Sequence, residues 1–210
     1  MDGRIPWVVG VSGASGTPYA AAVLRGLLAA GQPVDLIVSK AARLTLLDET
    51  GIAFRDGQWK DDLAAWLGEP VTGDVRYWMS SDIAAGPSSG SYRTHGMVVV
   101  PASTAAVAGI ALGLSKDLLQ RAADVTLKER RPLVVVPREM PLARPTLVHM
   151  LALHDAGAVV APASPGFYAG ARDVRDLADF VAGKVLDVLG VEHQLFRRWE
   201  GRLGAARLDE

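Results

Sequence analysis

The sequence predicts a single-domain α/β protein, with a flavodoxin-like or Rossmann-like layered fold and a central parallel sheet, spanning residues 1–210. Short runs rich in β-branched residues alternate along the whole chain with stretches of helical periodicity. Turns rich in glycine, serine or proline follow most of these runs, and the even alternation offers no point at which to divide the chain. A doubly wound sheet gathers such turns at one edge, where ligands bind.

The composition argues against several classes of protein. With 210 residues, 50% of them hydrophobic, the chain can bury one sizeable core, yet no apolar run approaches the ~20 residues of a membrane span. It has no cysteine, and its 4 histidines show no metal-ligand spacing. A net charge of -1 without a basic block argues against nucleic acid as a partner. We expect a soluble, cytoplasmic, metal-free protein whose high apolar content indicates further burial in an oligomer.

The first predicted strand, residues 7–11, is a valine-rich run of the kind found in buried parallel sheets. It leads into the turn Gly13-Ala14-Ser15-Gly16 and then into a helix expected from Tyr19 to Ala30. The glycines allow the backbone to approach a ligand closely, and the N–H groups that begin a helix attract anions. The turn therefore predicts phosphate or nucleotide binding, although its spacing matches neither the dinucleotide nor the Walker fingerprint. A tight turn that only required small residues is the alternative.

The second strand, Val34 to Val38, ends at Ser39, and a helix is expected over residues 41–49. Ser39 lies where a doubly wound sheet binds ligands, and an ordinary helix N-cap is the other open interpretation. The segment 51–74 is polar, and we expect its two tryptophans to anchor packing.

The loop Ile83 to Tyr92 is rich in glycine and serine and precedes the strong strand Met97 to Val100. It is either a functional loop or a flexible linker. The strand is expected to break at Pro101. Ser103 and Thr104 then begin a helix of small residues, which places a second anion-attracting helix N-terminus at the same sheet edge.

The later elements bring charged groups to that edge. An amphipathic helix over 117–130 leads to the strand 133–136, which ends in the turn Pro137-Arg138-Glu139-Met140-Pro141. Two prolines stiffen a turn that presents a cation beside a carboxylate, either as a surface ion pair or as part of a site. The remaining expected elements are a helix (146–155), a short strand (158–160), a proline-rich loop (162–168), a helix (173–189) and a C-terminal tail (190–210) whose Leu195, Phe196 and Trp199 need a surface.

Six motifs in chain order resemble the flavin prenyltransferases of the UbiX/Pad1 family. They are G-A-S-G at 13–16, S-K-A-A at 39–42, S-S-G-S at 88–91, R-A-A-D-V-T-L-K-E-R-R-P-L at 121–133, P-R-E-x-P at 137–141 and P-G-F-Y at 165–168. Each is weak alone, but together they cover nearly the whole chain and are highly specific.

The resemblance implies a cytoplasmic homododecamer that joins a dimethylallyl group, taken from dimethylallyl phosphate, to N5 and C6 of reduced FMN. The product, prenylated FMN, would serve a UbiD-type decarboxylase. The implied FMN-binding residues are Gly13, Ala14, Ser15, Ser39, Ser103, Thr104, Ala105, Ala106 and Arg121 or Arg138. The implied substrate-binding residues, partly shared across a subunit interface, are Ser89, Lys128, Arg138, Glu139, Tyr168 and Lys184, and the implied catalytic ones are Glu139, Lys128 and Ser15.

The chemistry of the reaction agrees with this set. Ionising an allylic C–O bond builds negative charge on the departing phosphate, which cations can stabilise without a metal. Closing the second ring on the flavin requires a proton to leave C6, and Glu139 is the residue we expect to serve as acid and base. We expect FMN rather than FAD or NAD, since no acidic residue is placed to bind an adenosine ribose.

Two departures and two alternatives stay open. Where the family reads C-S-x-x-T, this chain has Ala102 to Ala106, so one hydroxyl on the flavin side is missing, and P-G-F-Y is followed by Ala169 to Arg172. One alternative is an FMN-dependent cysteine-type decarboxylase of the same fold, although no histidine follows the first turn as those enzymes require. The other is a non-catalytic flavin-binding subunit.

Overall fold

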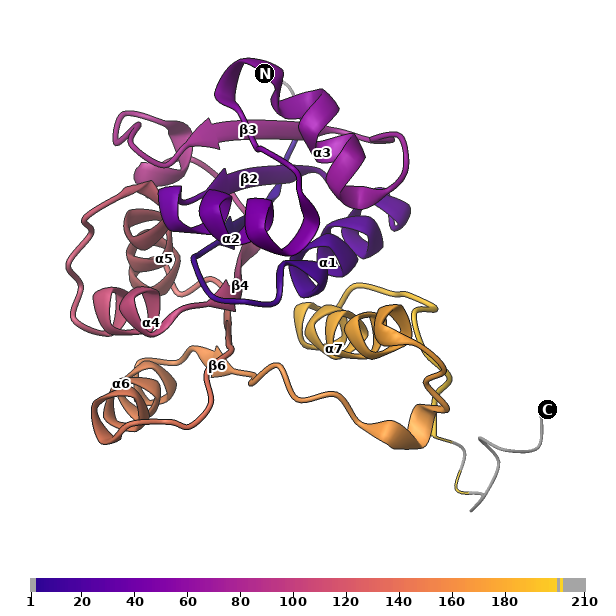
Figure 1. Ribbon diagram of the computed structural model, residues 1–210. Coiled ribbons are helices and arrows are strands. Elements are labelled where there is room, and N and C mark those ends of the chain that lie inside the picture. The colour runs from indigo at the N-terminus through magenta and orange to yellow at the C-terminus, as the bar shows by residue number, and fades with distance from the viewer. Residues whose placement is uncertain (1–2, 200, 202–210) are drawn as a thin grey trace.

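The computed structural model describes residues 3–199 and 201, and within them one parallel sheet has the strand order β3-β2-β1-β4-β5-β6 (Figure 1). The strands are β1 (Trp7–Val11), β2 (Val34–Val38), β3 (Val75–Met79), β4 (Gly96–Ala102), β5 (Leu133–Pro137) and β6 (Val159–Val160). The helices are α1 (Thr17–Ala29), α2 (Lys40–Thr50), α3 (Trp59–Leu67), α4 (Thr104–Ala111), α5 (Leu118–Lys128), α6 (Arg144–Asp155) and α7 (Val174–Leu189), with short 3-10 turns at Asp56–Gln58, Gly86–Ser88 and Phe167–Ala169. This is a doubly wound order that reverses between β1 and β4, so the predicted fold class is confirmed.

Helices cover both faces of the sheet, and the alternation of side chains along each strand divides the core in two. Val9 and Val11 face the layer formed by α1, α2, α3 and α7, whereas Val8 faces α4 and α5. Figure 1 shows α4, α5 and α6 on the left of the sheet and α1, α3 and α7 on its right. Burial on both faces explains why β1, β2, β4 and β5 read as continuous apolar runs.

Several observed elements depart from the expected ones, among them helix α3, which was not expected, and α6, which begins two residues early. Strand β3 was not expected, because its Val-Arg-Tyr-Trp-Met sequence is only half-buried at the sheet edge and lacks an apolar run. Strand β4 continues through Pro101, because the irregularity in its pairing with β5 falls between Val99 and Ala102, where a missing N–H can be accommodated. Helix α1 begins two residues early, with Pro18 in its first turn.

The C-terminal tail finds its surface on its own chain. The Phe196 ring lies 4.9 Å from the Phe180 ring of α7, and Gly183 leaves room for it, since a Cβ there would approach it to 2.5 Å. Phe196 is therefore covered by its own chain and does not require a partner subunit. Trp199, further along the tail, remains 56% exposed. Residues 200 and 202–210 of the predicted tail lie outside the described residues.

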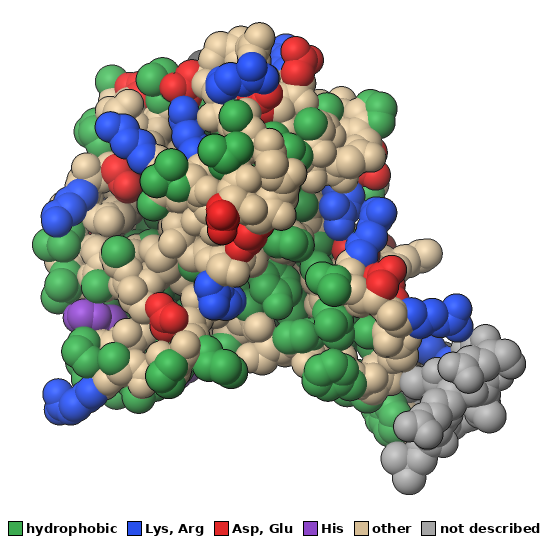
Figure 2. Space-filling model, viewed as in Figure 1, with side chains coloured by type: hydrophobic (Ala, Val, Ile, Leu, Met, Phe, Trp, Pro, Cys, Tyr) green, Lys and Arg blue, Asp and Glu red, His purple; other side chains and the backbone are tan. Residues whose placement is uncertain are grey.

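Exposed large apolar side chains lie on several other elements, and three of them follow one another along α6. Leu147, Val148 and Leu151 are 50%, 47% and 60% exposed. Figure 2 shows apolar side chains along the concave lower side of the molecule, between the arms formed by α6 and α7. None of the helices in the described part of the chain combines the length and apolar character needed to span a bilayer.

A buried ionic network holds the amino edge of the sheet, opposite the edge where the predicted turns lie. The fully buried Asp35 of β2 accepts hydrogen bonds from Arg4 Nη1 at 2.7 Å and from the Tyr92 hydroxyl at 2.8 Å. Arg4 also pairs with Asp74, which is 54% exposed. Burial and the neighbouring Asp35 carboxylate raise the pKa of Tyr92 to about 12, so its hydroxyl stays a donor.

We predict that Asp35→Ala lowers the free energy of unfolding by about 3–5 kcal/mol, because it removes the buried carboxylate that accepts from both Arg4 Nη1 and the Tyr92 hydroxyl. Asp74→Ala is the matched control. It removes a carboxylate from the same guanidinium, but an exposed one, so its expected cost is within about 1 kcal/mol. Urea denaturation of both variants measures the difference, and equal losses would contradict the central role of Asp35.

Candidate functional site

The turns after β1 and β4 lie side by side at the carboxyl edge of the sheet, joined by the buried hydroxyl of Ser12. Ser12 Oγ donates to the Pro101 carbonyl at 2.8 Å and accepts the Ser103 N–H at 2.7 Å. Ser103 in turn caps α4 by accepting the Ala106 N–H at 3.2 Å. The first turn and the start of α4 are thus held together at the point where the strand order reverses, and both lie at the same sheet edge, as the sequence predicted.

The start of α2 completes this edge. Ser39 is 9% exposed and accepts the Ala42 N–H at 3.1 Å, so it is the N-cap of α2. Gly13 packs closely against this helix, since a Cβ there would lie 2.4 Å from that of Ala41. Helices α1, α2 and α4 therefore all begin at one edge, which concentrates the positive ends of three helix dipoles there.

An anion does lie at the start of α1, but it belongs to the protein. Glu49, in the last turn of α2, accepts the Gly16 N–H at 2.8 Å, the Thr17 N–H at 2.9 Å and the Thr17 hydroxyl at 2.6 Å. Burial opposes ionisation, but bonds from Thr17, Ser15 and Gly16 outweigh it and hold the pKa of Glu49 below its ordinary value. The helix end predicted to bind a ligand's phosphate is thus already occupied.

The sequence analysis did not identify Glu49, although one signal pointed to it. An acidic side chain in the last turn of a helix is disfavoured by the helix dipole and by the free carbonyl groups there. Its occurrence at the end of α2 indicates a partner outside that helix, and the partner is the N-terminus of α1.

The turn after β5 reaches the first turn through Arg138, whose Nε donates to the Ser15 carbonyl at 2.8 Å. A cavity of about 370 Å³ lies here, bounded by Ser15, Glu49, Arg138 and the first turns of α1 and α7. This cavity combines backbone and hydroxyl groups, a cation and the apolar side chains of α7, so it can accommodate a ligand that is partly apolar and partly anionic.

Glu139 does not pair with its neighbour Arg138. Its side chain is exposed, and Oε1 accepts the N–H of Met140 at 3.0 Å. No ion pair joins Arg138 and Glu139 within the described residues, so the surface-pair interpretation of this turn is wrong. The carboxylate stands free beside the edge that carries the cavity.

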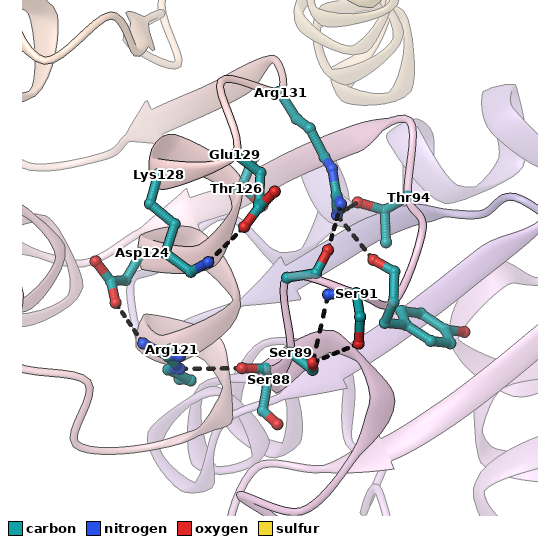
Figure 3. Close-up of polar contacts among 12 residues, drawn as sticks. Ser88, Ser89, Ser91, Thr94, Arg121, Asp124, Thr126, Lys128, Glu129 and Arg131 are labelled. Carbon is teal, nitrogen blue, oxygen red and sulfur yellow. Dashed lines mark hydrogen bonds and ion pairs between the residues drawn. The ribbon is translucent and has the colours of Figure 1, made fainter.

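A second group of predicted residues lies on α5 and on the loop that leads into β4 (Figure 3). Arg121 donates to the Ser88 carbonyl at 3.1 Å and to Asp124 at 2.7 Å. Lys128, at the end of α5, pairs with Glu129. The Ser89 and Ser91 hydroxyls lie 2.9 Å apart. Within one chain this group does not meet Glu139, because α5 carries Lys128 away from the carboxyl edge of the sheet.

The third group lies beside α7. The half-exposed Tyr168 ring packs edge-on against Phe180 at 5.4 Å. Lys184, four residues after Phe180 on the same helix face, approaches Asp187 at 3.5 Å. Among the described residues, no group of three or more histidine, aspartate or glutamate side chains is arranged to hold a metal ion.

The structure thus brings together the predicted cofactor residues but separates the predicted substrate residues. Gly13 to Ser15, Ser39, Ser103 to Ala106 and Arg138 gather at one edge, whereas Arg121 joins the α5 group. The predicted substrate residues lie in three separate places, which hold Ser89 and Lys128, Arg138 and Glu139, and Tyr168 and Lys184, and all of them except the half-buried Arg138 are exposed.

Comparison with known proteins agrees with this geometry. The flavoprotein family model matches residues 1–186. Flavin prenyltransferase UbiX of Streptomyces coelicolor is 68% identical to this chain, over 97% of the chain and 99% of that protein.

Solved structures are similar as well. The crystal structure of AnUbiX (PadA1) in complex with FMN and dimethylallyl pyrophosphate has a TM-score of 0.83 at 38% identity, covering 95% of this chain and 99% of that one. A dodecameric FMN-dependent UbiX-like decarboxylase from Escherichia coli O157:H7 has a TM-score of 0.82 at 40% identity, covering 94% of this chain and 100% of that one. The chain therefore belongs to the flavoprotein family and, within it, to the flavin prenyltransferases of the UbiX type.

Proposed function

We propose that this protein transfers a dimethylallyl group from dimethylallyl phosphate to N5 and C6 of reduced FMN, forming prenylated FMN. The observation that carries the proposal is the cavity between the first turn and Arg138, at the edge where three helices begin. Its lining combines apolar side chains and the Arg138 cation with the Glu49 carboxylate, which is already bonded to the start of α1, and it suits a flavin whose anionic group lies at Arg138. The 68% identity to a flavin prenyltransferase supports the same reaction rather than the cysteine-type decarboxylase alternative.

The residues at this edge fit FMN as the flavin. Thr104 and Ala105 begin α4 with N–H groups that have no partner within the described residues, and they would hold oxygen atoms of the flavin or its phosphate. The N–H of Ala106 remains bonded to the Ser103 cap, so the threonine hydroxyl missing at this position does not disturb the helix start. Gly13 to Ser15 and Ser39 would complete the contact surface.

The cationic residues would stabilise the departing phosphate. As the allylic C–O bond ionises, negative charge grows on the phosphate, and preorganised cations lower the free energy of that transition state. Lys128, Arg138 and Lys184 would supply this charge, with donor hydroxyls from Ser89 and Tyr168. The allyl cation would form against an apolar surface and the flavin ring.

Because these residues form separate exposed groups in one chain, we propose that each site is assembled from more than one copy. The exposed leucines of α6 offer apolar surface for such an assembly, and a dodecamer like that of the UbiX-like protein from E. coli is the arrangement we favour. Arg121 and Lys128 of one copy would then face the first turn and Arg138 of another.

Glu139 is the acid and base in this proposal. It is the exposed carboxylate beside the cavity edge, with no cation paired to it among the described residues. It can accept the proton that leaves C6 when the second ring closes, directly or through the departed phosphate, whereas the cationic Arg138 cannot. A cytoplasmic location and delivery of the product to a UbiD-type decarboxylase complete the proposal.

We predict that the protein binds FMN more tightly than NAD and converts reduced FMN to a product heavier by one dimethylallyl unit. Strand β2 is followed by Ser39-Lys40, so no carboxylate stands where an adenosine ribose would need one. Calorimetry compares the two ligands, and mass spectrometry of reactions with the monophosphate and the diphosphate donor identifies the product. Tighter NAD binding, or unchanged FMN with both donors, would count against the proposal.

We predict that Glu139→Gln folds and binds FMN but loses on the order of 10²-fold in kcat, the usual effect of removing an acid or base. Glu69→Gln makes the same change at an exposed glutamate that follows α3, and it should turn over like the parent. If Glu139→Gln turned over at the parental rate, Glu139 would not be the acid and base of the reaction.

We predict that Lys128→Met and Arg138→Met, each nearly inactive alone, recover activity when they are co-expressed. If the two residues meet only across a subunit interface, chance assembly leaves about one half times one half, or about a quarter, of the sites with both native side chains. Turnover of the purified mixture measures the recovery. A mixture no more active than its components would place both residues in the same chain's site.

A further inference from the structure

The loop that carries Ser89 depends on one guanidinium group. Arg131, which follows α5 by three residues, donates from Nη1 to the Tyr92 carbonyl at 2.8 Å and to the Thr94 hydroxyl at 3.2 Å, and from Nη2 to the Gly90 carbonyl at 2.8 Å (Figure 3). These three acceptors span the part of the loop that precedes β4. A planar guanidinium can bridge several acceptors at fixed angles, which an ammonium group cannot.

The backbone of Gly90, which Arg131 holds, lies against the side chain of Lys128. A Cβ on Gly90 would collide with Glu129 Oε1 and would lie 2.7 Å from Lys128 Nζ, so the loop backbone lies directly against the two charged heads. The φ angle of Gly90 is not in the left-handed region, and glycine is therefore required here for space rather than for conformation.

The Lys128–Glu129 pair is held as a unit on this surface. The hydrogen bond and charge of Lys128, with a smaller contribution from Arg131, hold the pKa of Glu129 below its ordinary range. Glu129 therefore stays ionised and holds the Lys128 ammonium beside the Gly90 backbone, in the loop that also carries Ser89 and Ser91 (Figure 3). Lys128 is 46% exposed, so the group can still face a second copy.

We infer that Arg131 is a positioning residue for the prenyl donor: it fixes the Gly90 backbone, and that backbone sets where Lys128 and Ser89 present their donors. The inference rests on the proposed function, in which these two residues bind the donor's phosphate. Among the described residues, the Arg131 guanidinium donates hydrogen bonds only to this loop.

The test compares Arg131→Met with Arg130→Met. Both remove one positive charge, at adjacent positions, but the exposed Arg130 side chain makes no hydrogen bond or ion pair with any described residue. We expect Arg131→Met to raise the KM for dimethylallyl phosphate on the order of 10-fold and to lower kcat as well, because Lys128 also stabilises the departing phosphate, while the affinity for FMN stays within about 2-fold of the parent. Arg130→Met should keep parental values of all three.

Gly90→Ala provides a second, independent variant. It preserves every charge and the loop hydrogen bonds, and its methyl group displaces only the flexible heads of Lys128 and Glu129, so the fold should survive even where Arg131→Met does not fold. It should raise the donor KM in the same direction without weakening FMN binding.

The outcomes separate this inference from the proposed function. If the parent enzyme forms prenylated FMN but Arg131→Met and Gly90→Ala both keep the donor KM of Arg130→Met, Arg131 is not a positioning residue. The same conclusion follows if Arg131→Met does not fold and Gly90→Ala keeps the parental donor KM. If the parent forms no prenylated FMN with either donor, the proposed function fails, and the inference fails with it.

Discussion

The reversal of strand order between β1 and β4 is the constraint on which the rest of this site depends. At that point two neighbouring strands send their helices to opposite faces of the sheet, and a crevice opens between the turns. The buried Ser12 hydroxyl joins the two sides of this crevice, because it donates a hydrogen bond to the Pro101 carbonyl and accepts one from the Ser103 N–H. An alanine there would leave the Ser103 N–H without this acceptor, whereas the Pro101 carbonyl would keep only the bond from the backbone N–H of residue 12.

The electrostatics of the crevice follow from the same topology. Three helices begin at one edge, and without a counter-charge their N-terminal N–H groups would remain unsatisfied. Glu49 satisfies those of α1 and makes that turn rigid. The N–H groups at the start of α4, which have no partner among the described residues, and the Arg138 guanidinium then remain available to an external anion.

Within one chain, the cationic side chains lie on three separate parts of the surface rather than close to one another. Holding Lys128, Arg138 and Lys184 within a few ångströms of one another in a free monomer would be costly, since like charges repel and burial removes their hydration. Assembly of copies around an anionic substrate would bring such charges together only where a phosphate neutralises them. The exposed apolar side chains of α6 offer a surface through which copies of the chain could associate.

The local pattern of the sequence was sufficient for the layered fold and most of its elements. Val34–Val38 was predicted to the residue, because a parallel strand buried on both faces leaves a run of apolar residues that periodicity detects. The half-buried β3 leaves no such run and was missed. The small-residue turns likewise identified the edge that holds the site.

Which groups meet at the site depends on how separate elements pack, and the sequence pattern did not reveal it. Glu49 accepts hydrogen bonds from Gly16 and Thr17, which lie more than thirty residues before it in the chain. Arg138, which follows β5, donates to Ser15, which follows β1, although β4 lies between these two strands. The same is true of Arg131 and the Gly90 loop. Sequence periodicity reports the environment of each residue along its own element, whereas such pairings depend on how separate elements pack, so the sequence alone determined the fold and the tertiary structure decided the contacts of the site.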